Sequence, residues 1–242
     1  MNPKIKSIST VQSLLLFGIP SAVFVAICWL LIPELNQNYQ LHPALSWFIG
    51  GFLIFMPLFL MAIFLARKDG HRTRDLIFSR LRLRKMTSRD WKFALLSTLV
   101  IVILTGLIMG ISKLLHVRFG IPEIEPTPSF MKFEAFSGNE RYLLLVWIVM
   151  FFFNIAGEEL MWRGYILPRQ EISIGKKAWV FNASLWLLFH ICFGIQLIIL
   201  LIPILLILPY AVQKTQNTFV GIYIHALVNG PSFIMVSLGI IG

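Results

Sequence analysis

The stretch YLLLVWIVMFFFNIAGEELMWRGYIL, residues 142–167, is long and apolar enough to cross a bilayer, yet it carries Glu158, Glu159 and Arg163. A helix adds about 1.5 Å per residue, so this stretch exceeds the roughly 30 Å of the hydrocarbon core. A charge inside that core is costly unless a partner, a water-filled cavity or a function compensates for it. The stretch therefore predicts a membrane fold with a polar site inside it.

Similar apolar runs occupy most of the chain, which has 242 residues, 57% of them hydrophobic and only 13% charged. Pro168 is expected to end the run at 142–167. The region 178–212 suits two shorter or tilted helices that turn near 194–196, the second bent by its prolines. The remaining runs lie at 11–32, 44–66, 93–115 and 218–241. We predict an all-α, polytopic membrane helix bundle with about seven transmembrane helices and an intramembrane catalytic cavity.

Ten Lys and Arg residues lie between the second and third runs, in the segment 67–92, and account for much of the net charge of +10. The positive-inside rule places this loop in the cytoplasm, where it would touch anionic lipid headgroups. Clustering beside membrane ends disfavours nucleic acid as a partner. Lys4 and Lys6 put the amino terminus on the same side, and the acidic, Pro-rich loop 116–141 falls outside.

The first run, at 11–32, is longer than the apolar part of a typical signal peptide, so we expect a retained membrane anchor. The chain is then an integral, multi-pass protein, expected in a bacterial plasma membrane. Residues 1–141 would supply three membrane helices with the basic loop 67–92, and residues 142–242 a catalytic core. Cys28 and Cys192 fall within apolar runs and predict neither a disulfide nor a metal site.

The ionisable groups inside the later runs fall at one depth. Counted from the nearest Lys or Arg expected at the cytoplasmic face, Glu158 and His225 lie eleven residues away and His190 thirteen. These separations correspond to depths of roughly 16, 16 and 20 Å along a helix. Three helices thus bring an acid and two imidazoles to one level, which unrelated structural polar residues have no reason to do.

Helical spacing suggests how these groups pair. Glu159 and Arg163 are four residues apart with the acid first, so they share a face and can neutralise each other. Glu158 points about 100° away and lacks that partner. His225 and Asn229 also share a face. Trp186 precedes His190 by one turn and can brace its ring.

Each feature alone has a plain structural explanation, because buried ion pairs, packed histidines and helix-bridging asparagines are common. Their coincidence favours a site. Glu158 would take a proton from water that His190 positions, and His225 with Asn229 would hold a tetrahedral oxyanion. A second version places zinc between Glu158, His190 and His225, with an open position for water. HExxH is absent from the sequence, so a metal is not encoded by the usual zinc motif.

Three segments together carry a family resemblance: GEELMWRG (157–164), SLWLLFH (184–190) and HALVN (225–229). Their EExxxR, aromatic-xxx-His and HxxxN patterns resemble the CPBP family, the CAAX protease and bacteriocin-processing (Abi) proteins, which includes the Ras-converting CAAX endopeptidases. The resemblance covers about 142–235 and departs at Trp186, where Phe is common. It implies a helical intramembrane protease in which Glu158 and His190 activate water, and it favours a glutamate over a zinc mechanism.

The expected activity is hydrolysis of a peptide bond in a membrane-associated peptide or protein. The resemblance leaves the substrate open among prenylated CAAX proteins, bacteriocin precursors and signalling peptides. Two non-proteolytic readings compete with it. A transporter would need polar residues that continue toward both faces, and the first three runs contain almost none. The second non-proteolytic hypothesis is a catalytically silent immunity protein that retains the fold.

Overall fold

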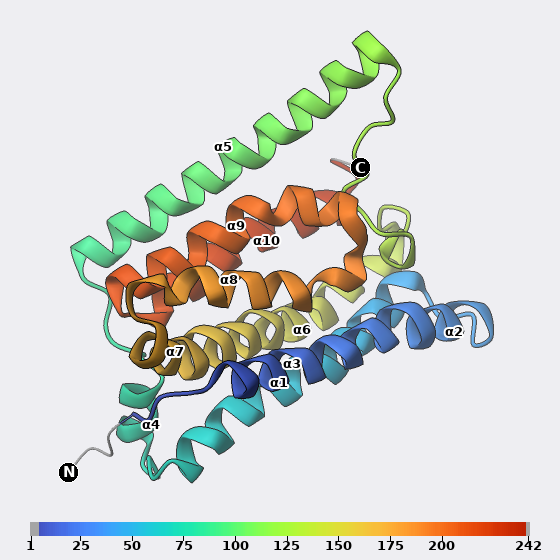
Figure 1. Ribbon diagram of the computed structural model, residues 1–242. Helices are drawn as coiled ribbons and strands as arrows, with labels where there is room; N and C mark the ends of the chain where they lie inside the picture. Colours follow the sequence, from blue (N-terminus) through green and yellow to red (C-terminus); the bar gives the residue numbers. More distant parts are fainter. Residues whose placement is uncertain (1–4, 241–242) are drawn as a thin grey trace.

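The computed structural model describes residues 5–240, which are helical wherever they are regular and contain no strand (Figure 1). Six helical stretches in this part of the chain are long and apolar enough to cross a membrane. The prediction of an all-α, polytopic membrane bundle is therefore confirmed, and the protein is an integral, multi-pass membrane protein. Lys4 and Ile241, which the sequence analysis used, lie outside the described residues.

In the first half of the chain, two long helices are joined by a short connection, and a third long helix stands apart from them. The elements of this half are α1 (Thr10–Ala26), the π-helix η1 (Ile27–Leu31), α2 (Ile32–Gln37), α3 (Pro43–Lys68), α4 (Arg74–Arg80) and α5 (Ser88–Phe119). Capping boxes start α1 at Ser9 and α5 at Thr87, where each side chain accepts from the third helical N–H. Figure 1 shows α5 standing at the margin of the bundle.

The second half holds the segment with the two glutamates. Its elements are η2 (Ser129–Met131), η3 (Gly138–Tyr142), α6 (Leu143–Glu158), the π-helix η4 (Glu159–Ile166), α7 (Leu167–Ile174), η5 (Gly175–Lys177), α8 (Ala178–Phe189), η6 (Ile191–Phe193), α9 (Gly194–Thr215) and α10 (Thr218–Ser237). The expectation that Pro168 ends the fourth run is wrong, because α7 continues through it. Pro168 occupies the first turn of α7, where an α-helix tolerates a missing N–H.

The region 178–212 does fold back on itself, but earlier than predicted. Helix α8 has 12 residues and ends before His190, and α9 already begins at Gly194, so the turn occupies 190–193 rather than 194–196. At about 18 Å, α8 alone is too short to cross a roughly 30 Å core. The difference between six candidate spans and the predicted seven is this short helix.

Helix α6 packs directly on the backbone of α3. A Cβ on Gly157 would lie 2.4 Å from the carbonyl oxygen of Phe55, so no larger residue fits without moving a helix. One helical turn further on, Trp162 stacks on Phe17 of α1 with 4.1 Å between ring centroids. The junction of α6 and η4 is thus held at the centre of the bundle.

Part of the basic segment is built into the fold rather than facing lipid. Arg80 of α4 is buried, and its two terminal nitrogens donate at 3.2 Å to the carbonyl oxygens of Gly164 and Tyr165 in η4. Arg82 makes a two-pronged ion pair with Glu171 of α7, at 2.7 and 2.8 Å. These arginines satisfy main-chain and carboxylate oxygens of the protein itself.

The same segment also contacts the start of α10. Thr218 donates its hydroxyl to the carbonyl oxygen of Leu81 at 2.6 Å and its N–H to that of Arg82 at 3.0 Å. We call this end of the bundle, where α4, α7 and the start of α10 meet, the basic end. It lies at the lower left of Figure 1.

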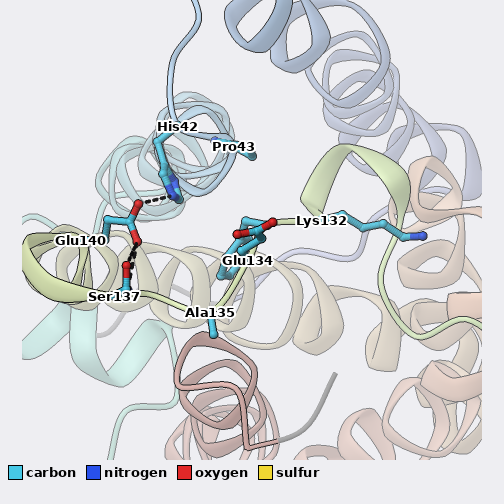
Figure 2. A pocket seen from close by; sticks show the side chains of 8 residues that line it. His42, Pro43, Lys132, Glu134, Ala135, Ser137 and Glu140 are labelled. Atoms are coloured by element: carbon cyan, nitrogen blue, oxygen red, sulfur yellow. Dashed lines mark hydrogen bonds and ion pairs between the residues drawn. The ribbon is translucent and has the colours of Figure 1, made fainter.

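The opposite end carries the loop between α5 and α6. His42 at the start of α3 reaches Glu140 of this loop at 3.8 Å, and Ser137 donates to the same carboxylate (Figure 2). They border a pocket of about 380 Å³ that mixes acidic, basic and hydroxyl groups. The loop is thereby held against α3.

Candidate active site

The seven residues singled out in the sequence come from α6, η4, α8, the turn after α8, and α10. In chain order they are Glu158, Glu159, Arg163, Trp186, His190, His225 and Asn229. The first six side chains are buried, and Asn229 is half-buried. A cluster of ionisable groups inside an apolar bundle is costly unless its members pair with one another, and several of them do.

Glu158 is held by two neutral donors. The side-chain amide of Asn154, one turn earlier on α6, donates to Oε1 at 2.9 Å, and the indole N–H of Trp186 donates to Oε2 at 2.5 Å. The carboxylate makes no hydrogen bond with Arg163, as the helical spacing predicted. Each oxygen accepts one hydrogen bond and has a second lone-pair direction left.

Glu159 is held by two basic side chains. Its Oε1 accepts from a terminal nitrogen of Arg163 at 3.1 Å and from Nδ1 of His225 at 3.0 Å, and all three side chains are buried. Gly221 of α10 makes room for this carboxylate, because a Cβ there would lie 2.5 Å from Oε2. The predicted Glu159–Arg163 pair is present, and His225 is an additional partner.

Trp186 contacts four other members of the cluster. The Arg163 guanidinium carbon lies 3.5 Å from the centre of its ring, a close cation–π contact. The rings of His190 and His225 meet the indole edge to face, with centroids 5.2 and 5.5 Å away. Trp186 thus braces His190, as predicted, and also contacts Glu158, Arg163 and His225.

The two histidines are oriented differently. His190 uses Nδ1 to donate to the carbonyl oxygen of Trp186 at 2.9 Å, because a carbonyl can only accept. Its Nε2 is then the acceptor in the neutral ring. His225 directs Nδ1 toward Glu159, which leaves its own Nε2 for another partner. The side chain of Asn229, one turn further along α10, makes no hydrogen bond with another residue of 5–240.

The formal charges of the cluster do not balance. Glu158 and Glu159 are two carboxylates, and Arg163 is the one guanidinium among the cluster residues. With ionised carboxylates and neutral imidazoles, the cluster would carry one net negative charge in a medium of low dielectric, which is unfavourable.

The zinc alternative does not fit this arrangement. Among residues 5–240, no three His, Cys, Asp or Glu side chains come together as a group that could hold a metal ion. Glu158, His190 and His225, the three proposed ligands, do not form such a group. We therefore derive no catalytic step through a metal.

The sequence analysis missed two polar contributors. Asn154 contacts Glu158 from the same face of α6, four residues earlier, and that spacing could have indicated it. Asn182 of α8 is fully buried and donates to the carbonyl oxygen of Trp162 and the side chain of Gln170. No sequence spacing predicts this second contact, because it joins α8 to η4 and α7.

Comparison with known proteins agrees with this geometry. Residues 140–230 match the model of the family described as type II CAAX prenyl endopeptidase Rce1-like. No curated protein and no solved structure matches the chain. The matched segment contains all seven cluster residues, from Glu158 to Asn229. The chain thus carries an Rce1-like type II CAAX prenyl endopeptidase domain of the CPBP (Abi) family, a family of proteases.

Proposed function

We propose that the protein is an intramembrane endopeptidase that cleaves a membrane-associated peptide or protein with Glu158 as the general base. The observation that carries this proposal is that two adjacent carboxylates have different hydrogen-bond partners. Glu159 is bonded to the Arg163 guanidinium and to His225, whereas Glu158 is bonded only to neutral donors. Environments that separate neighbouring acids in this way assign them different roles, one structural and one in proton transfer.

In the first step Glu158 removes a proton from a water molecule while the water oxygen attacks the carbonyl carbon of the peptide bond. One of the two Glu158 oxygens accepts the proton in its free lone-pair direction. The Nε2 of His190 accepts a hydrogen bond from the same water and orients it, because Nδ1 is occupied by the Trp186 carbonyl.

The carbonyl oxygen becomes an oxyanion in the tetrahedral intermediate. His225 and Asn229 stand one turn apart on α10 and would donate to it, His225 through Nε2–H in its protonated form. The Glu159 carboxylate stabilises that imidazolium through Nδ1. Glu158 then returns its proton to the departing amine as the C–N bond breaks, which leaves a carboxylic acid and an amine.

The direct test is cleavage by the purified chain in liposomes. A library of peptides tethered to the membrane would include members with and without a C-terminal prenyl group, and products would be identified by mass spectrometry. Cleavage at a defined bond is expected in at least one class. If no peptide is cut while the liposomes show proton or solute flux, a transporter replaces the protease.

Cleavage should survive metal removal. Because Glu158, His190 and His225 do not converge as ligands, we expect the rate to change less than about twofold after incubation with 1,10-phenanthroline, whereas loss of a catalytic zinc stops water activation. The measurement is the initial rate before and after chelation. A rate that falls to background and returns on addition of zinc would contradict the glutamate mechanism.

Trp186→Phe should slow cleavage about tenfold or more, because it removes the indole N–H that donates to Glu158. The variant keeps an aromatic ring over Arg163. We expect the loss in kcat, with KM little changed, since Trp186 positions the base rather than the peptide. The matched variant Trp186→Leu also removes the ring and should lower thermal stability as well. Equal kcat values for wild type and Trp186→Phe would show that Glu158 does not need this hydrogen bond to act as the base.

A further inference from the structure

A groove of about 490 Å³ runs between α5 and α9 at the basic end, away from the candidate active site. Its wall is apolar and its mouth is basic. The residues that define this α5–α9 groove are Arg89 and Lys92 at the mouth and Phe93, Leu96, Val100 and Ile207 along the wall.

Helix α5 contacts α10 at the basic end and α9 further along. At the basic end, Trp91 packs on Tyr223 of α10 with 4.7 Å between centroids. Deeper in the membrane, the Thr105 hydroxyl donates to the carbonyl oxygen of Leu200 at 3.4 Å. Only 11% of the most apolar window of α5 is buried, so most of this helix faces outward.

Two cations, Arg89 and Lys92, lie at the mouth, and a third, Lys214, is nearby. The Arg89 guanidinium folds over the ring of Phe93 at 5.7 Å, and Lys214 of α9 lies 5.5 Å from the ring of Tyr210, which also lines the groove. Neither these two side chains nor Lys92 forms an ion pair with any residue between 5 and 240. Their positive charge is therefore available to a ligand.

The carboxylate next to the mouth does not cancel this charge. Asp90 is buried and already makes a two-pronged ion pair with Arg84, at 2.7 and 3.0 Å. No acidic residue lines the groove itself. An anionic group at the mouth would meet Arg89 and Lys92 near the start of α5, with Lys214 of α9 close by, and nearby cations strengthen binding of an anionic headgroup.

The length of the groove favours a lipid over a soluble anion. Arg89 and Val100 are eleven residues apart on α5, a separation of about 16 Å. One leaflet contributes about half of a roughly 30 Å hydrocarbon core, or ~15 Å. A molecule with its phosphate at the mouth would thus have its acyl chain reach the end of the groove at the bilayer midplane.

We propose that the α5–α9 groove binds a phospholipid with an anionic headgroup from the leaflet on the basic side. Its phosphate lies among Arg89, Lys92 and Lys214. One acyl chain lies along the apolar wall between the two helices. This inference does not depend on peptide cleavage, because none of these residues belongs to the candidate active site.

The test uses the full chain in a zwitterionic detergent, titrated with phosphatidylglycerol or phosphatidylcholine, with bound lipid counted by native mass spectrometry. Phosphatidylglycerol should bind about tenfold more tightly or better, since each nearby cation strengthens binding of an anionic headgroup. Arg89→Gln with Lys92→Gln should reduce its affinity to that of phosphatidylcholine. Ser97→Trp, which fills the groove, should weaken both lipids.

The matched control is Lys113→Gln with Arg118→Gln, which removes two exposed charges from the other end of the same helix and should change nothing. Circular dichroism confirms that each variant is folded. Three results would overturn the proposal: equal binding of the two lipids, equal loss in the control, or displacement of the lipid by glycerol phosphate at similar concentration. The last would identify a site for a soluble anion.

Discussion

Glu158→Gln should reduce the rate of peptide cleavage by about 10²- to 10⁴-fold, the contribution that a positioned general base makes to catalysis. Glutamine keeps an oxygen to accept the Trp186 indole N–H and is close in size, so the buried cluster should remain assembled. What it loses is the capacity to take a proton from water. The measurement is kcat in liposomes, with the thermal unfolding midpoint as the check on folding.

Glu159→Gln is the matched control, because it removes one negative charge at the adjacent position. The carboxylate of Glu159 is bonded to Arg163 and His225, so its loss should lower the unfolding midpoint more than Glu158→Gln does. Some cleavage should remain, since the base is intact. Should Glu158→Gln cut the peptide at the wild-type rate, the assignment of the general base would have to be abandoned.

Arg163→Met should destabilise the fold by about 3 kcal/mol or more, because breaking a buried ion pair leaves an uncompensated charge. Arg163 is fully buried, donates to Glu159 at 3.1 Å and covers the ring of Trp186. Methionine has a similar length, so it keeps much of the packing, but it carries no charge. Unfolding in dodecyl maltoside on heating, followed by circular dichroism, measures the loss.

A second variant distinguishes charge from packing. Glu159→Gln combined with Arg163→Met removes both partners, so the double variant should be more stable than Arg163→Met alone. Glutamine still offers an oxygen to His225, which keeps the rest of the cluster in place. If the double variant were instead the less stable of the two, an unpaired Glu159 charge would not be the cause of the loss in Arg163→Met.

The sequence predicted the membrane class and the ion pair because both depend on local spacing. Glu159 and Arg163 are four residues apart and do pair, and the apolar runs do become helices. Pro168 misled the prediction, because a π-helix precedes it and an α-helix begins anew at Leu167. A π-helix bonds i to i+5, so the rotation of 100° per residue no longer holds beyond Glu158.

Contacts between helices could not be read from spacing. The indole N–H of Trp186 reaches Glu158 across 28 positions of sequence, and His225 reaches Glu159 across 66. Both require the rotation of α8 and α10 about their own axes, which packing sets. Catalytic roles for these residues, the amino terminus in the cytoplasm and the division at residue 141 stay predictions.

Arg80 has a consequence for how this protein can be dissected. It belongs to the first third of the chain, yet it holds the carbonyl oxygens at the end of η4, the helix that carries Glu159 and Arg163. Thr218 is tied to the same loop. A chimera that transplants residues 142–242 onto foreign membrane helices would leave these groups without donors or acceptors. Residues 142–242 are therefore not expected to fold correctly in such a chimera unless the loop 67–92 is transferred with them.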